Sequence, residues 1–248
     1  MMTDLYPEPP HLSAFVEPGL EQSTALLAAW GVLTASGCVF SGDVLVARDH
    51  GWFRDVSDVE REVVQHSGSP RDLLVNRDPL RIQFRHRSIG VVALGLSSAV
   101  EFGEPHPVEV AIHAGPLSLP VKLWSRQDRQ AAKRLSGWME RLLLAISGPT
   151  EAQYGALGIE AQFPTPAGLA GIHRSAVWPT TWFWPSQLST RAAFEERELL
   201  SSLSQGAVTR SREGTLFRAW RPGAEVAVDE PGIDSVVNFL NRVIGTPR

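Results

Sequence analysis

Residues 125–149 read SRQDRQAAKRLSGWMERLLLAISGP and predict the longest helix of the chain. Over 126–147 the apolar residues recur every three or four positions, which places them in one stripe along a helix: Ala131, Leu135, Trp138, Leu142 and Ile146. Ser125 with Asp128 three residues later is the pattern of a capping box, and Gly148-Pro149 is a typical helix end. A long amphipathic helix over 126–147 is therefore expected.

Strands are predicted on both sides of this helix. After it, apolar and polar or small residues alternate over 156–163, which is the two-residue period of a half-buried strand. Before it, segments 80–87, 89–102 and 107–114 read as strands joined by short turns, and they are most simply paired antiparallel. The chain is thus predicted to be α+β, with a mainly antiparallel sheet and the long helix and further helices packed on one face.

The remaining segments complete the expected organisation. Residues 1–18, with four prolines, read as an extended arm, and 164–189 as a long ordered loop. A short helix is expected after the capping pair Ser57 and Glu60, and a last helix opens at Asp229 and Pro231. At 248 residues the chain is expected to be a single α+β domain over 1–248, the alternative being a division into two lobes near 118–125.

Composition excludes some classes of partner. Twenty-three basic and twenty-seven acidic residues leave a net charge of −4, so no nucleic acid partner is expected. No apolar run approaches the roughly 20 residues of a membrane helix, and the acidic N-terminus lacks the features of a secretory signal, so we expect no membrane association. The single cysteine, Cys38, lies in an apolar run and suits a buried residue in a reducing compartment, which indicates a cytoplasmic protein.

Local signatures of catalysis are missing. The sequence contains no HExxH or CxxC metal pattern, no GxSxG or SxxK nucleophile pattern, and no GxGxxG or GxxxxGK[ST] phosphate loop. We therefore expect no metal and no cofactor, and a non-enzymatic protein is favoured.

An aromatic segment is the first candidate binding site. Residues 178–185 read WPTTWFWP, with prolines that limit the entropy lost when the segment is ordered. Tryptophan is enriched at binding hot spots, so Trp178, Trp182, Phe183 and Trp184 are predicted to anchor a partner. The alternative is an aromatic strand or loop that caps the core.

The polar face of the predicted sheet is the second candidate. Alternation places five ionisable side chains on one face: Arg81, Arg85, Arg87, Glu109 and His113. In an enzyme, His113 would be the base, Glu109 would orient it, and Arg85 would bind an anion. The alternative is a solvated sheet face with cross-strand charge pairs.

Three segments carry a resemblance to a known class of protein. Residues 154–169, YGALGIEAQFPTPAGL, the Trp-Phe-Trp segment and residues 214–220, GTLFRAW, resemble small α+β immunity proteins of bacterial polymorphic-toxin systems over about a quarter of the chain. The resemblance implies a protein that binds and blocks a cognate toxin without a cofactor. It assigns no individual site residue.

Three functions follow as hypotheses. The first is a soluble, non-enzymatic binding protein, an immunity or inhibitor protein that blocks a partner protein through residues 178–184. The second is an enzyme acting on a small organic or acyl substrate at His113, Glu109 and Arg85. The third is a structural or regulatory subunit that forms a homo-oligomer through its apolar C-terminal helix.

Overall fold

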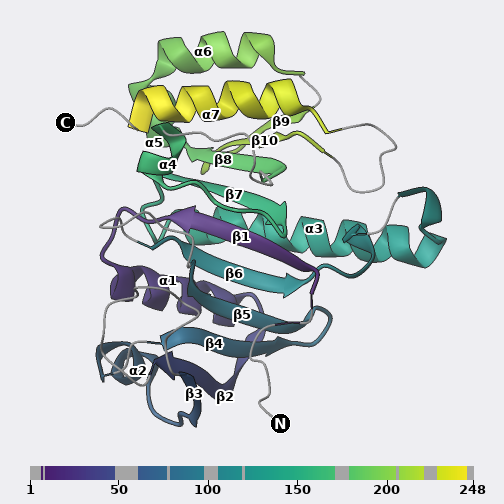
Figure 1. Cartoon of the computed structure of the whole chain (residues 1–248). Helices are drawn as coiled ribbons and strands as arrows, with labels where there is room; N and C mark the ends of the chain where they lie inside the picture. The colour runs from purple at the N-terminus through teal and green to yellow at the C-terminus, as the bar shows by residue number, and fades with distance from the viewer. Residues whose placement is uncertain are drawn as a thin grey trace.

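The computed structural model describes residues 7, 9–47, 61–76, 79–97, 106–118, 121–170, 179–204, 207–220 and 228–244. One antiparallel sheet runs through the described part of the molecule, in the order β3-β2-β4-β5-β6-β1-β7-β8-β10-β9 (Figure 1). Its strands are β1 (His11–Glu17), β2 (Cys38–Ala47), β3 (Arg61–Gln65), β4 (Pro79–His86), β5 (Gly90–Leu96), β6 (Val108–His113), β7 (Tyr154–Ile159), β8 (Thr181–Pro185), β9 (Val208–Arg210) and β10 (Gly214–Arg218). Every neighbouring pair in this order is antiparallel.

Helices occupy several connections between these strands, and α7 follows the last strand. They are α1 (Gln22–Ala35), α2 (Pro70–Asn76), α3 (Arg126–Ser147), α4 (Pro166–Ala170), α5 (Ser186–Arg191), α6 (Ala193–Ser202) and α7 (Glu230–Ile244), with short 3₁₀ turns η1 (Gly115–Ser118) and η2 (Val121–Leu123). The predicted α+β class, with a mainly antiparallel sheet, is confirmed. The predicted pairing of the three strands before the long helix is also confirmed, as β4-β5-β6.

Strand β1 lies at the centre of the sheet, between β6 and β7. The prediction of an extended N-terminal arm is therefore wrong for residues 11–17. Both neighbours supply ladder partners: Phe15 pairs with Glu109 of β6 and with Ala156 of β7. Because apolar side chains on both faces of this strand are buried, its sequence lacks the alternation that identifies a half-exposed strand.

One face of the sheet is covered by α1 and α3. The predicted capping box is present, since the Ser125 hydroxyl accepts a hydrogen bond from the Asp128 amide and the Asp128 carboxylate accepts one from the Ser125 amide. The helix buries a stripe against the sheet: Ala132, Leu135, Trp138, Met139, Leu142, Leu143 and Ile146. These side chains join a core with Leu12, Ala14 and Val16, the residues of β1 that point to this face.

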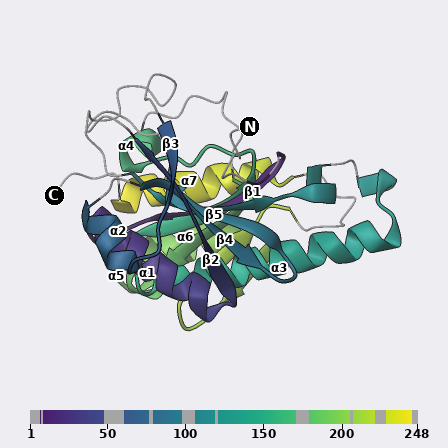
Figure 2. The ribbon, with the colours of Figure 1, turned by 90° about the horizontal axis from the view of Figure 1, so that it is seen from below.

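The opposite face is covered at one end by α4, α5, α6 and α7. A second core lies there, built from Phe15, Tyr154, Trp182, Trp184 and Phe217 of four strands and from apolar residues of these helices. The helices thus pack on both faces and not on one as predicted (Figure 2). The second core contains no residue of β2, β4, β5 or β6, so the polar half of this face lies beside it.

Segment 164–189 is not the long loop that was predicted. Its described residues form α4, β8 and the first residues of α5. Ser57 and Glu60, which predicted a short helix, lie outside the described residues, and residues 61–65 form strand β3. The predicted last helix is confirmed as α7, and strands β9 and β10 form an antiparallel pair before it.

Candidate functional site

The aromatic segment is an interior strand. In β8, which pairs with β7 and β10, the side chains of Trp182, Phe183 and Trp184 are each 0% exposed. Phe183 points into the core under α3, whereas both tryptophans point into the core under α7. These three residues cannot contact a partner in this conformation, so the prediction of an exposed aromatic anchor is wrong for them. Trp178 lies outside the described residues.

Both buried tryptophans have hydrogen-bond acceptors for their indole N–H groups. Trp182 Nε1 donates to the carbonyl of Pro179 at 2.9 Å. Trp184 Nε1 donates to Oε1 of Glu196, a buried carboxylate of α6, at 2.8 Å. The same oxygen accepts hydrogen bonds from the hydroxyl groups of Ser189 at 2.7 Å and Thr215 at 3.1 Å. This network fixes α6 against the sheet, and it gives the aromatic residues a structural role.

The polar sheet face has the composition that was predicted. Arg85 of β4 and Glu109 and His113 of β6 lie on one face, because their neighbours Phe84, Val110 and Ile112 enter the core on the other. Arg85 and His113 are exposed and Glu109 is half-buried. Arg81 lies on the same face, whereas Arg87 follows the end of β4.

The geometry of this face separates the predicted catalytic groups. Glu109 and His113 are four residues apart on one strand, so their Cα atoms lie about 13 Å apart. The Glu109 carboxylate accepts a hydrogen bond from the Ser13 hydroxyl at 2.8 Å, and His113 lies directly opposite His11 of β1. The separation along the strand keeps the predicted base and its orienting group apart, and their catalytic role stays a prediction.

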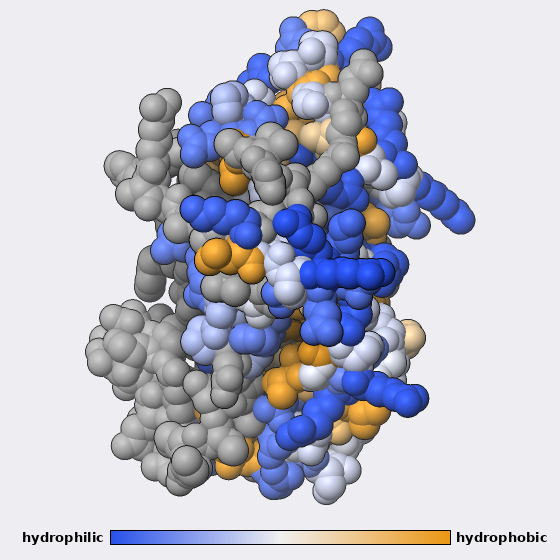
Figure 3. Space-filling model, turned by 90° about the vertical axis from the view of Figure 1, so that its right-hand side faces the viewer, coloured by the Kyte–Doolittle hydropathy of each residue, from blue (hydrophilic) through white to orange (hydrophobic). Residues whose placement is uncertain are grey.

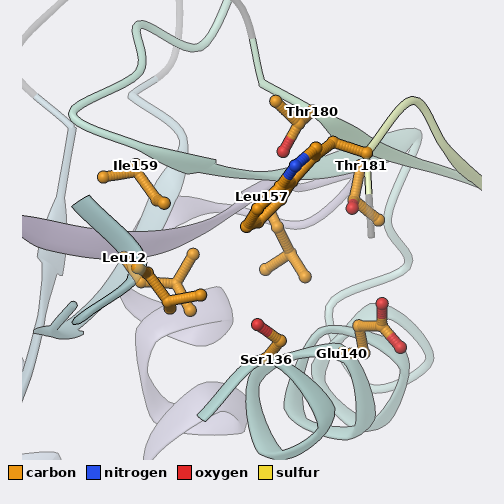
Figure 4. A pocket seen from close by; sticks show the side chains of 9 residues that line it. Leu12, Ser136, Glu140, Leu157, Ile159, Thr180 and Thr181 are labelled. Atoms are coloured by element: carbon orange, nitrogen blue, oxygen red, sulfur yellow. The ribbon is translucent and has the colours of Figure 1, made fainter. Parts of the chain in front are cut away.

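A small hollow lies between α3 and β7 (Figure 4). Ser136 and Glu140 of α3 line it on one side, and Leu157 and Thr181 on the other. Its free volume of about 20 Å³ is enough for a water molecule and too small for a metabolite.

Neither a metal cluster nor a membrane-spanning helix is found in the described part of the chain. No three His, Cys, Asp or Glu residues there come together as metal ligands. None of the helices there has the length and the apolar character needed to cross a membrane.

The outer face of α1 has an unusual composition. All fourteen residues of this helix are uncharged, although 20% of the chain is charged. The exposed positions form one stripe at helical spacing: Thr24, Leu27, Gly31, Thr34 and Ala35. Leu27, near the middle of the stripe, is 38% exposed. We call this surface the α1 face.

The α1 face was not identified among the candidate sites, although one signal was readable from the sequence. A run of fourteen residues at the average composition of this chain would hold about three charges, and residues 22–35 hold none. Which of these residues face solvent depends on the packing of α1 against α3 and the sheet, which the sequence alone does not specify.

Comparison with known proteins adds little. No protein-family model and no curated protein matches this sequence. Among solved structures, the chain is similar to the Pseudomonas aeruginosa T6SS protein PA0821, with 11% sequence identity, a TM-score of 0.45, and coverage of 95% of this chain and 73% of that one. A similarity this low assigns neither a family nor an activity.

Proposed function

We propose that this protein acts by binding another protein, as an inhibitor or immunity protein, and that the α1 face is its contact surface. The observation that supports the proposal is the uncharged outer stripe of α1. Depletion of charged residues is the compositional signal of the core of a protein interface. The exposed positions of α6, which include Arg197 and Glu198, show the charged composition that is usual for a solvated helix.

The shape of this surface also favours a macromolecule. Sites for small ligands are concave, whereas the exposed side of a helix that packs on a sheet is convex. Gly31 lies in the middle of the stripe, and a Cβ atom placed there would meet nothing within 4 Å. The surface is therefore open enough for a partner to approach the helix backbone closely.

The place of action follows from cysteine usage. The single cysteine suits a reducing compartment, so we place this binding in the cytoplasm. An inhibitor that acts there by covering its partner needs no cofactor, which agrees with the function implied by the resemblance to immunity proteins.

Site-specific photo-crosslinking tests the proposal. A photoreactive phenylalanine analogue replaces Leu27 in the full chain, expressed in its source cell, and a matched variant carries it at Ser201, an exposed position of α6. We expect an adduct with one other protein from position 27 only. Purified partner should then lose activity when this protein is added, and Gly31→Arg should prevent that loss.

Three outcomes would contradict the proposal. Equal yields of adduct from positions 27 and 201 would mean that the α1 face is not a specific contact surface. An adduct of twice the chain mass would mean that the α1 face joins two copies of this protein. An isolated partner whose activity is unchanged by binding would exclude an inhibitor.

The shared face of Arg85, Glu109 and His113 supports a second candidate, an enzyme on a small organic or acyl substrate. Arg85 would hold the anionic group of the substrate and His113 would transfer a proton. A screen of carboxylate-bearing esters would test it. We expect activity in the unmodified protein, its loss in His113→Gln, and unchanged folding in both; no activity in the unmodified protein would exclude this candidate.

A further inference from the structure

The outer face of α3 carries a row of cations. Arg126, Lys133, Arg134 and Arg141 are exposed, and their spacing of seven and eight residues places them on the side of the helix opposite its buried stripe. The row is about 22 Å long at 1.5 Å per residue. One acidic residue, Glu140, follows Lys133 by seven positions and therefore lies at the Lys133 edge of this side of the helix. We call these four residues the α3 cationic row.

The acidic residues nearest in sequence are engaged elsewhere. Asp128 caps the start of the helix through Ser125. The carboxylate of Glu140 accepts two hydrogen bonds from Arg218. Among the described residues, none of the four cations of the row has an ion-pair partner. The row therefore presents positive charge that the described part of the chain does not neutralise.

This positive charge contrasts with the rest of the molecule. Residues 122–141 contain six Lys and Arg and two Asp and Glu, a charge of +4, whereas the whole chain carries −4. The remainder therefore carries −8. Opposite charges separated in this way steer a charged partner toward one surface. Figure 3 looks at the end of the molecule where α3 begins, and hydrophilic side chains with some hydrophobic ones between them cover the part of this surface that is not grey.

The row lies on the same side of the sheet as the α1 face. Helices α1 and α3 contact each other and pack on the same face of the sheet, so their outer sides point in the same direction (Figure 2). The segment before α1 meets the end of α3, where the Gly19 amide donates to the Thr150 carbonyl at 3.2 Å.

We propose that the partner is a protein that presents an acidic surface, rich in Asp and Glu, to the α3 cationic row beside an uncharged area against α1. This inference rests on the proposed function, whose partner class it specifies. Arginine binds carboxylates in a bidentate geometry, and three of the four cations are arginines. An uncharged area beside the cations suits a protein better than a nucleic acid, whose surface is charged along its whole length.

Binding of defined polyanions to the purified full chain tests the inference. The probe is a fluorescent 20-residue poly-L-glutamate, titrated at low ionic strength and followed by anisotropy. We expect K133E/R134E to weaken binding about tenfold or more, because two attractions become repulsions. The matched control R197E/R212E has the same net charge at exposed positions elsewhere, and we expect it to change the affinity less than threefold.

A second pair of substitutions distinguishes a loss of binding from a loss of folding. R126E/R141E changes the two ends of the row, and the helical circular dichroism of every variant is compared with that of the unmodified chain. The inference is overturned if the control pair weakens binding as much as K133E/R134E. It is also overturned if duplex DNA of equal charge, or vesicles containing phosphatidylserine, bind more tightly than poly-L-glutamate.

The two proposals fail separately. If poly-L-glutamate binds through the row but position 27 yields no adduct, the proposed function is wrong and the charge preference of α3 stands. If the adduct forms but its cross-linked segment is not acidic, the proposed function stands and the inference about the partner is wrong.

Discussion

Arg218 of β10 donates two hydrogen bonds to the carboxylate of Glu140 in α3, from Nε at 2.6 Å and from Nη2 at 2.8 Å. Its Nη1 also donates to the Thr209 hydroxyl of the edge strand β9 at 2.7 Å. Both charged side chains are about four-fifths buried. This bidentate pair fixes the middle of α3 to the last strands of the sheet, beside the hollow that Glu140 lines.

Arg218→Ala should lower the free energy of unfolding by about 1–3 kcal/mol, because the largely buried Glu140 carboxylate loses its partner. Urea denaturation of the two proteins measures the difference. Arg210→Ala is the control, since the Arg210 side chain is 65% exposed and lies 3.9 Å from Glu196. We expect Arg210→Ala to lower the free energy of unfolding by less than about 0.5 kcal/mol. Equal effects in the two variants would contradict the structural role of the Arg218 pair.

Trp182→Ala should destabilise the fold by about 3–5 kcal/mol, because it opens a cavity in a strand whose side chain is fully buried. Phe194→Ala, at a side chain that is 66% exposed, should change stability by less than about 0.5 kcal/mol. The free energies come from chemical denaturation followed by fluorescence. A soluble Trp182→Ala protein of unchanged stability would mean that β8 is not an interior strand.

Two glycines should respond to alanine in opposite directions. At Gly214 a Cβ atom would lie 2.2 Å from the Trp184 carbonyl oxygen, so Gly214→Ala must displace the backbone of β8 or β10 and should lower the melting temperature. At Gly31 nothing lies within 4 Å, so Gly31→Ala should stabilise α1 by up to about 1 kcal/mol and raise the melting temperature by about 2–4 °C. Calorimetry measures the melting temperature of each variant. A change of the same sign in Gly214→Ala and Gly31→Ala would contradict the packing described for β8 and β10.

Burial raises the pKa of the Cys38 thiol from 9.0 to about 11. The native protein should therefore react slowly with Ellman's reagent at pH 8 and react fully once unfolded. The folded state holds its proton more tightly than the unfolded state, so this contribution to stability is complete below pH 9 and is lost as pH rises toward 11. Cys38→Ala should flatten the stability profile in that range. Rapid reaction of the native thiol at pH 8 would contradict the burial of Cys38.

Local periodicity predicted the elements that have one polar side. Helix α3 has the predicted bounds, and its cap is formed by the predicted pair, Ser125 and Asp128. Strands β4 and β6 also alternate, because one face of each enters the core and the other carries Arg85, Glu109 and His113. In such elements the alternation or helical spacing of apolar residues indicates which side chains are buried.

The elements buried on both faces could not be predicted in this way. The centre of β8 is aromatic, and that of β1 is apolar except for Ser13. Nothing local therefore distinguishes these interior strands from an arm or an exposed loop. For the candidate site, the exposure of the aromatic side chains could not be predicted from local sequence either. Trp182 and Trp184 are good anchors by residue type, but α7 and the Glu196 network cover them, and that packing is set by residues more than ten positions away.

The central position of β1 has a consequence for biosynthesis. Phe15 and its ladder partner Ala156 are 141 residues apart, so one edge of the first strand stays without its neighbour until β7 leaves the ribosome. At typical translation rates this interval is roughly 7–30 s. During that time an apolar strand with open backbone groups is exposed to pairing with other nascent chains. The growing polypeptide is therefore most prone to aggregate between the emergence of β1 from the ribosome and the emergence of β7.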